Sequence, residues 1–121
     1  MGKAGINILT LFLCAMAFAQ PQPQALVDTT AMTIGEDIHY ELRIQTDSTA
    51  QVAFPKDQSF LPFEIIDTTK INRTFVGDKT DWSRVYTLIH FDSGTYHIPQ
   101  QKVWVDGIAF STDSLKIQVH T

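Results

Sequence analysis

Residues 91–99 read Phe-Asp-Ser-Gly-Thr-Tyr-His-Ile-Pro, and this stretch decides the predicted fold. The order Asp-x-Gly-x-Tyr-x-apolar is typical of the tight corner that leads into a central strand of an immunoglobulin-like β-sandwich. Gly94 can adopt a turn conformation that strains any residue with a Cβ, and Asp92 can bond nearby backbone amides. We expect the ring of Tyr96 to pack inward while its hydroxyl donates to a backbone carbonyl a few residues upstream. Asp92, Gly94 and Tyr96 are therefore predicted to form a structural corner.

Alternating apolar and polar residues predict strands on both sides of this corner. Before it, one face of residues 38–45 is apolar, which indicates a long strand with one buried side; that face holds Ile38, Tyr40, Leu42 and Ile44. After it, residues 115–119 alternate in the same way, with Leu115, Ile117 and Val119 facing inward. Between these two strands, Asp106-Gly107 separates two β-prone runs, which is a strong hairpin signal.

Two segments leave the side-chain directions less clear. The run from 82 to 91 is apolar on both faces, so its inner face stays unassigned; Val85, Thr87, Ile89 and Phe91 oppose Trp82, Tyr86 and Leu88. Residues 56–62 are predicted to be a polar crossover in which Phe60 and Leu61 plug the core. Seven to nine short strands with turns between them predict an antiparallel, immunoglobulin-like β-sandwich over residues 25–121.

The first residues have the features of a secretory signal. Lys3 precedes an uncharged run that ends in Ala17-Phe18-Ala19, with small residues at the two positions that signal peptidase reads. We therefore predict a signal peptide over residues 1–19, cleaved between Ala19 and Gln20. The alternative is a lipoprotein signal at Cys14, although Leu13 stands where that signal needs a small residue. Residues 20–24 are predicted to form an extended Pro/Gln spacer that does not pack.

Composition indicates how the domain is stabilised and which classes of partner it disfavours. Cys14 is the single cysteine, so the predicted mature chain has none and must be stabilised by its core rather than by disulfides. The formal net charge of −4 argues against nucleic acid or an anionic membrane surface as the main partner.

Residue types used in catalysis gather near the corner without a recognisable spacing. His90, Asp92 and Ser93 are the residue types of a hydrolase triad, but adjacent strand residues point to opposite faces and cannot converge. His90, Asp92 and His97 form at most a loose metal site, and solvated histidines are the simpler interpretation. We predict no catalytic residue, no metal and no cofactor.

Two tryptophans are candidate contact residues. If Val103 and Val105 face inward, Trp104 faces out, where an aromatic ring can anchor a partner. Trp82 is the second candidate. The same residues support an alternative function, a carbohydrate-binding module that stacks sugars on Trp82, Trp104 and Tyr86.

An ordered set of short motifs resembles a known family. The set comprises Gly94-x-Tyr96-x-Ile98-Pro99, Val103-x-Val105-Asp106-Gly107-x-x-Phe110-x-Thr112, Leu115-x-Ile117-x-Val119, the Ile34-Gly35-Glu36 bend and the Phe54-Pro55 strand end. It resembles the repeated ectodomain of the BatD-like aerotolerance proteins of the Bacteroidetes. The resemblance implies a membrane-anchored periplasmic protein with immunoglobulin-like domains, which assembles with von Willebrand A-domain membrane partners and a cytoplasmic MoxR-type ATPase. It implies no catalytic residues.

The resemblance carries two further expectations. The first is that the reading frame continues beyond Thr121 to a membrane anchor, since any link to the membrane needs a segment outside this chain. The second is O-glycosylation at Asp-Ser/Thr motifs of exported Bacteroidetes proteins, which would modify Thr29, Ser48, Thr68 or Ser114; turn formation is the alternative role of these motifs. The predicted function is a non-enzymatic, envelope protein–protein interaction domain that binds through an open sheet edge or an outward aromatic patch.

Overall fold

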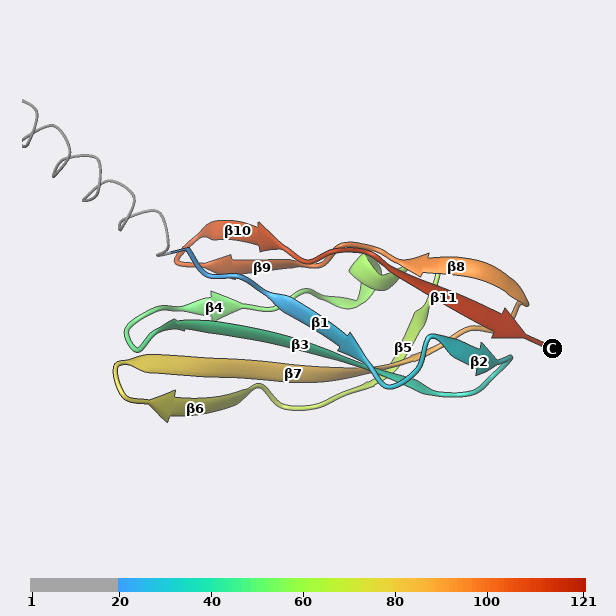
Figure 1. The fold of residues 1–121 in the computed structure, drawn as a ribbon, viewed down its shortest axis with the longest axis horizontal. Coiled ribbons are helices and arrows are strands. Elements are labelled where there is room, and N and C mark those ends of the chain that lie inside the picture. Colours follow the sequence, from blue (N-terminus) through green and yellow to red (C-terminus); the bar gives the residue numbers. More distant parts are fainter. Residues whose placement is uncertain (1–19) are drawn as a thin grey trace, which may run out of the picture.

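The computed structural model describes residues 20–121 (Figure 1). The predicted signal peptide, residues 1–19, and its cleavage site at Ala19 lie outside the described residues. Within residues 20–121 there are eleven strands and one short 3-10 helix, η1. Their bounds are β1 Gln24–Val27, β2 Ala31–Thr33, β3 Ile38–Asp47, β4 Val52–Ala53, η1 Asp57–Phe60, β5 Glu64–Thr68, β6 Asn72–Val76, β7 Lys79–Ile89, β8 Gly94–Ile98, β9 Lys102–Val105, β10 Ile108–Ser111 and β11 Leu115–His120.

One layer is a five-stranded antiparallel sheet built on β3 and β7. Its order is β1-β3-β7-β5, and β6 also pairs with β7, beyond the end of β5. The alternation predicted for β3 is confirmed, because Ile38, Tyr40, Leu42 and Ile44 are all buried. Burying each of these side chains contributes roughly 1.5–3 kcal/mol to the stability of the fold.

The register between β3 and β7 settles the inner face of β7, which the sequence left open. Trp82 lies opposite Ile44, and Leu88 lies opposite Ile38. Side chains directly opposite each other in a sheet share a face, so Trp82, Tyr86 and Leu88 point into the core. The outer face of β7 carries Val85, which is half-buried, and Thr87 and Ile89, which are each 9% exposed.

The other layer consists of two three-stranded sheets, ordered β10-β9-β4 and β2-β11-β8. The chain runs from β8 into β9 and from β10 into β11, as Figure 1 shows, so the two sheets are halves of one interrupted hairpin. At the interruption, the N–H of Thr112 donates to the carbonyl of Gln101, and the N–H of Gln101 donates to Oγ1 of Thr112, each at 2.9 Å. β2 pairs with β11 in parallel, and every other pairing is antiparallel.

The hairpin between β9 and β10 forms where Asp106-Gly107 predicted it. Asp106 has φ 51° and Gly107 has φ 83°, the left-handed conformations that a two-residue type I′ turn requires. The Asp106 side chain also accepts from the N–H of Gln51 at 2.9 Å, which joins the turn to the start of β4. The inward directions of Val103 and Val105 before the turn, and of Ile117 and Val119 after it, are confirmed by their burial.

The hydrogen bond predicted for the corner at residues 92–96 is present, but the strand that follows the corner is not a central one. The hydroxyl of Tyr96 donates to the carbonyl of Ser93 at 3.1 Å. However, β8 lies at the edge of its sheet rather than in the centre, and Tyr96 is only half-buried. The strand that could flank β8 is absent because Pro55 stops β4, and η1 follows in its place.

Three further predictions differ from the structure. The spacer over residues 20–24 was predicted not to pack, but Pro23 is buried and Gln24 already belongs to β1. Of the two predicted core plugs, Phe60 is buried, whereas Leu61 is 60% exposed. The strand number is eleven rather than seven to nine, because short breaks divide several long strands.

Over residues 20–121, no helix has the length and apolar character needed to cross a membrane.

Candidate functional site

Trp104 is the most exposed aromatic side chain on the outer face of the β10-β9-β4 sheet. Its neighbours Val103 and Val105 are buried, so the alternation of β9 turns the indole outward, as predicted. Across the sheet, Trp104 lies opposite Ala53 on β4 and opposite Ala109 on β10. Because both cross-strand neighbours have only a methyl group, the indole is left 39% exposed.

The exposed indole forms one wall of a groove of about 560 Å³. The residues that line this Trp104 groove are Ala53, Phe54, Pro55, Lys56, Ser59, Gln100, Lys102 and Trp104. The only charged side chains among them are Lys56 and Lys102, although the chain has a net charge of −4. The groove is therefore an apolar surface with two cations on a protein that is acidic overall.

Hydrogen bonds from the core hold the wall of the groove that follows β4. The hydroxyl of Tyr86 donates to the carbonyl of Pro55 at 3.0 Å. The Nε2 of Gln101, a fully buried side chain, donates to the carbonyls of Ser59 and Pro99, both at 2.9 Å. The hydroxyl of Ser59 donates back to Oε1 of Gln101 at 2.7 Å. These bonds position the groove before any partner arrives.

Sequence reasoning missed Gln101, the residue that joins the two halves of this layer. A glutamine is rarely fully buried unless its amide is paired. Its position directly after Pro99-Gln100, between two β-prone runs, marked an interruption in the strand. That signal did not distinguish a buried amide from an exposed one.

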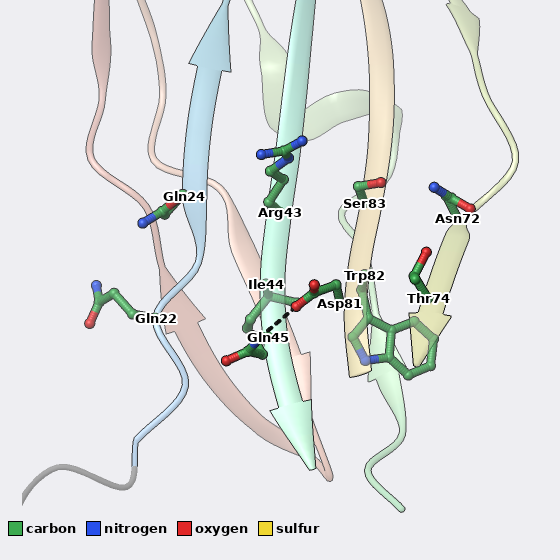
Figure 2. Close-up of a pocket in the computed structure, with 10 residues that line it drawn as sticks. All are labelled: Gln22, Gln24, Arg43, Ile44, Gln45, Asn72, Thr74, Asp81, Trp82 and Ser83. Atoms are coloured by element: carbon green, nitrogen blue, oxygen red, sulfur yellow. Dashed lines mark hydrogen bonds between the residues drawn. The ribbon is translucent and has the colours of Figure 1, made fainter. Parts of the chain in front are cut away.

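A second groove, of about 450 Å³, lies on the outer face of the five-stranded sheet (Figure 2). Two rows of polar side chains cross the strands there, because the register places them opposite one another. One row is Gln24, Arg43, Ser83 and Asn72, and the other is Gln45, Asp81 and Thr74. The Nε2 of Gln45 donates to Oδ1 of Asp81 at 2.8 Å. This face offers many hydrogen bonds but little apolar surface.

Two of the three aromatic rings that were predicted to stack on sugars are buried in the structure. Tyr86 is 1% exposed, and Trp82, although it lines the second groove, is only 9% exposed, so little of either ring is available for stacking. The Nε1 of Trp82 donates to the hydroxyl of Thr46 at 2.9 Å, which fixes the indole in the core. Trp82 was also predicted as a possible contact residue, and its burial contradicts that role. Trp104 alone remains available.

The candidate triad and metal-site residues near the corner take part in packing and hydrogen bonds of the fold or lie exposed on a strand. His90 is buried, and its ring lies 4.0 Å from that of Tyr96, centroid to centroid. The backbone N–H of Asp92 donates to Nδ1 of His90 at 3.1 Å, which occupies that nitrogen. His97 is exposed on β8, and Ser93 contributes its carbonyl to Tyr96. Within residues 20–121 there is no group of three or more His, Cys, Asp and Glu residues placed to hold a metal ion.

The four predicted O-glycosylation residues differ in accessibility. Ser48 is exposed in a turn, and Ser114 is exposed in the segment directly before β11. Thr68 is half-buried in β5, opposite Tyr86. Thr29 uses its hydroxyl in the turn after β1, donating to the carbonyl of Ala31 at 2.7 Å.

Asp28, in the same turn, joins β1 to β3. Its two carboxylate oxygens accept from the backbone N–H and from Nδ1 of His39, at 2.9 and 2.8 Å. Burial alone raises the pKa of Asp28, but the hydrogen bonds with the side chain and backbone of His39 outweigh it, and the pKa lies below 3.8.

Two layers of short strands and a tyrosine corner define an immunoglobulin-like β-sandwich. The chain belongs to the BatD family, since the model of the BatD DUF11-like domain matches residues 25–119. No curated protein sequence matches the chain. Among solved structures, a non-cellulosomal cohesin from the hyperthermophilic archaeon Archaeoglobus fulgidus is 12% identical, with a TM-score of 0.44; the match covers 85% of this chain and 93% of the cohesin.

Proposed function

We propose that this domain is a non-enzymatic protein–protein interaction module of the bacterial envelope, and that it binds its partner through the Trp104 groove. The observation that carries the proposal is the 39% exposed indole, which stands on a rigid sheet beside an apolar groove. Tryptophans in such positions contribute a large share of binding energy at protein interfaces. Export through residues 1–19, a periplasmic location and a membrane anchor outside this chain belong to the same proposal.

The charges of the groove specify the partner further. Among the lining side chains that the structure describes, Lys56 and Lys102 are the charged ones, so an acidic partner segment fits them best. The partners implied by the family resemblance are von Willebrand A-domain membrane proteins. Because the lysines are exposed, their attraction weakens as salt rises, whereas the apolar contact of Trp104 does not.

Carbohydrate binding is the second candidate function. The polar rows in Figure 2 supply amides and hydroxyls of the kind that bind sugars, and Trp104 supplies one exposed ring on the other layer. However, sugar-binding surfaces combine a stacking ring and hydrogen-bonding groups at one place. Here the polar groove and the exposed ring lie on different sheets, which favours the protein partner.

The experiment compares Trp104→Ala with the control Phe91→Ala, which removes another exposed ring. Phe91 belongs to the loop between β7 and β8, which lies at the other end of the sandwich from the β9–β10 hairpin in Figure 1. The exported chain is immobilised and incubated with membrane extract of the native host. We expect wild type and Phe91→Ala to retain the same acidic envelope protein, and Trp104→Ala to lose at least tenfold of it. Retention of a polysaccharide that depends on Trp104 would instead support the carbohydrate function. Equal retention of the protein by all three chains would overturn the proposal.

A further inference from the structure

The edge of the five-stranded sheet at β6 is unusually apolar and open. All five residues of β6 are exposed, and within residues 20–121 β6 pairs only with β7. Of the nine exposed large hydrophobic residues among the described residues, Phe75 and Val76 belong to β6, Ile71 directly precedes it, and Ile66 belongs to β5, which also pairs with β7. An exposed apolar edge strand is a template for another strand.

Proline lies next to several of the other edge strands, but not next to β6, nor next to β2 or β10. Pro21 and Pro23 precede β1, Pro55 follows β4, and Pro99 follows β8. A proline cannot donate to an added strand, so it limits pairing at an edge. No proline occurs between Pro62 and Pro99, the interval that contains β6. The β6 edge is therefore left available for pairing.

The backbone of β6 presents its free groups at alternate residues. Val76 and Lys79 flank a two-residue turn and form the last pair of the β6–β7 ladder. In such a hairpin these two residues exchange hydrogen bonds, and the alternate pairs Thr74–Asp81 and Asn72–Ser83 do the same. The N–H and C=O groups of Arg73 and Phe75 therefore point to the open edge.

We propose that a second copy of this chain pairs with β6, antiparallel and with its two-fold axis at Thr74, so that one sheet runs through both copies. This register places Arg73 of one copy opposite Phe75 of the other, and both residues direct their free backbone groups to the shared edge. In antiparallel pairing, those two residues exchange both of their hydrogen bonds. The two-fold arrangement contains this pair twice.

The side chains around β6 are self-complementary in the same register. Lys70 lies four residues before Thr74 and Asp78 lies four residues after it, so each lysine is brought close to the aspartate of the other copy. The guanidinium of Arg73 already lies 5.1 Å from the centroid of the Phe75 ring in its own chain. Pairing adds the Phe75 ring of the second copy to that contact. This complementarity favours a second copy over an unrelated acidic or basic strand.

A competing explanation is that Arg73 and Lys70 protect the edge of a monomer, as charged residues do on many edge strands. A matched pair of cysteine variants separates the two. Thr74→Cys places a thiol on the proposed axis, where opposed residues come within roughly 4.5–5.5 Å of each other. Thr95→Cys places a thiol on β8, an edge strand that is also exposed. Both are made in the exported chain with Cys14→Ser, so that each protein has one thiol.

We expect Thr74→Cys to form a disulfide-linked dimer under mild oxidation at least tenfold faster than Thr95→Cys. Sedimentation velocity of the unmodified chain should show a concentration-dependent dimer. Lys70→Asp should weaken that dimer by about threefold or more, because the altered charge repels Asp78 of the second copy, and the swap Lys70→Asp with Asp78→Lys should restore it. A monomer at every concentration, with equal oxidation of the two cysteine variants, would overturn the proposal. So would a Thr74→Cys adduct formed only with a different protein.

Discussion

The ring of Tyr96 occupies the space that a side chain at Gly94 would need. A Cβ built on Gly94 would lie 3.3 Å from Cε2 and 3.4 Å from the hydroxyl oxygen of Tyr96. Gly94 also has φ 140°, a conformation that residues with a side chain rarely adopt. The corner therefore depends on the absence of a side chain at one residue and on a large ring two residues later.

Gly94→Ala should destabilise the fold by about 1–3 kcal/mol, because it adds both backbone strain and a close contact with the ring. Gly107→Ala is the matched control, since Gly107 also has positive φ but has nothing within 4 Å of its added Cβ. We expect urea unfolding to show a larger loss for Gly94→Ala than for Gly107→Ala. Equal losses of stability in the two variants would mean that the Tyr96 ring moves away from the added Cβ without cost.

Tyr96→Phe removes the hydroxyl that donates to the carbonyl of Ser93 and keeps the ring. Since this hydrogen bond is exposed, water can replace it, and the expected loss is about 0.5–1.5 kcal/mol. The contact of the ring with His90 should survive, so the variant should keep the near-ultraviolet circular dichroism of the folded protein. An unchanged urea midpoint would show that the hydroxyl contributes nothing to the corner.

Asp28→Asn should make stability less dependent on acid. The pKa of Asp28 is lowered in the folded state, so its carboxylate stabilises the fold above pH 3.8 and loses this contribution as pH falls below that value. At pH 7 we expect the variant to be less stable by about 0–1 kcal/mol, a small effect because the carboxylate is half-exposed. The difference should disappear near pH 2. Urea midpoints at the two pH values measure it, and a difference that grows in acid would contradict the assignment.

The four candidate O-glycosylation residues can be ranked by the accessibility of their hydroxyl groups. Ser48 and Ser114 are exposed, whereas Thr29 already uses its hydroxyl in the turn and Thr68 is half-buried. Expression in a Bacteroidetes host should therefore add mass to Ser48 or Ser114 first, as measured by intact mass and peptide mapping. Ser48→Ala with Ser114→Ala should remove most of the added mass. An unmodified intact mass of the parent chain in that host would contradict the proposal.

Sequence patterns predicted the fold well where burial alternates along a strand. Ile38, Tyr40, Leu42 and Ile44 follow a period of two, and the core confirms each of them. Turn chemistry was equally informative at Asp106-Gly107, because few other residues adopt two positive φ angles in succession.

Predictions were weaker where contacts between distant segments decide whether a side chain is buried or exposed. Trp82 and Trp104 are the same residue type, but the first is buried and the second lies on an outer face. Only the pairing of Trp82 with Ile44 and of Trp104 with Ala53 separates them. The Trp104 groove depends likewise on Lys56, Lys102 and the buried amide of Gln101, which the fold brings together from distant parts of the sequence.

The most direct test of the proposed function is photo-crosslinking from position 104 in the native host. A photoreactive aromatic amino acid, which keeps a ring in the groove, replaces Trp104 in one chain and Phe91 in the control, since both side chains are exposed. Trp104 belongs to β9, whereas Phe91 belongs to the loop between β7 and β8, which lies at the other end of the sandwich from the β9–β10 hairpin in Figure 1. We predict one adduct of defined mass from position 104, containing an acidic envelope protein, and none of that mass from position 91. Lys102→Glu in the same chain should reduce the adduct. No adduct at position 104, or the same adducts at both positions, would contradict a partner bound in the Trp104 groove.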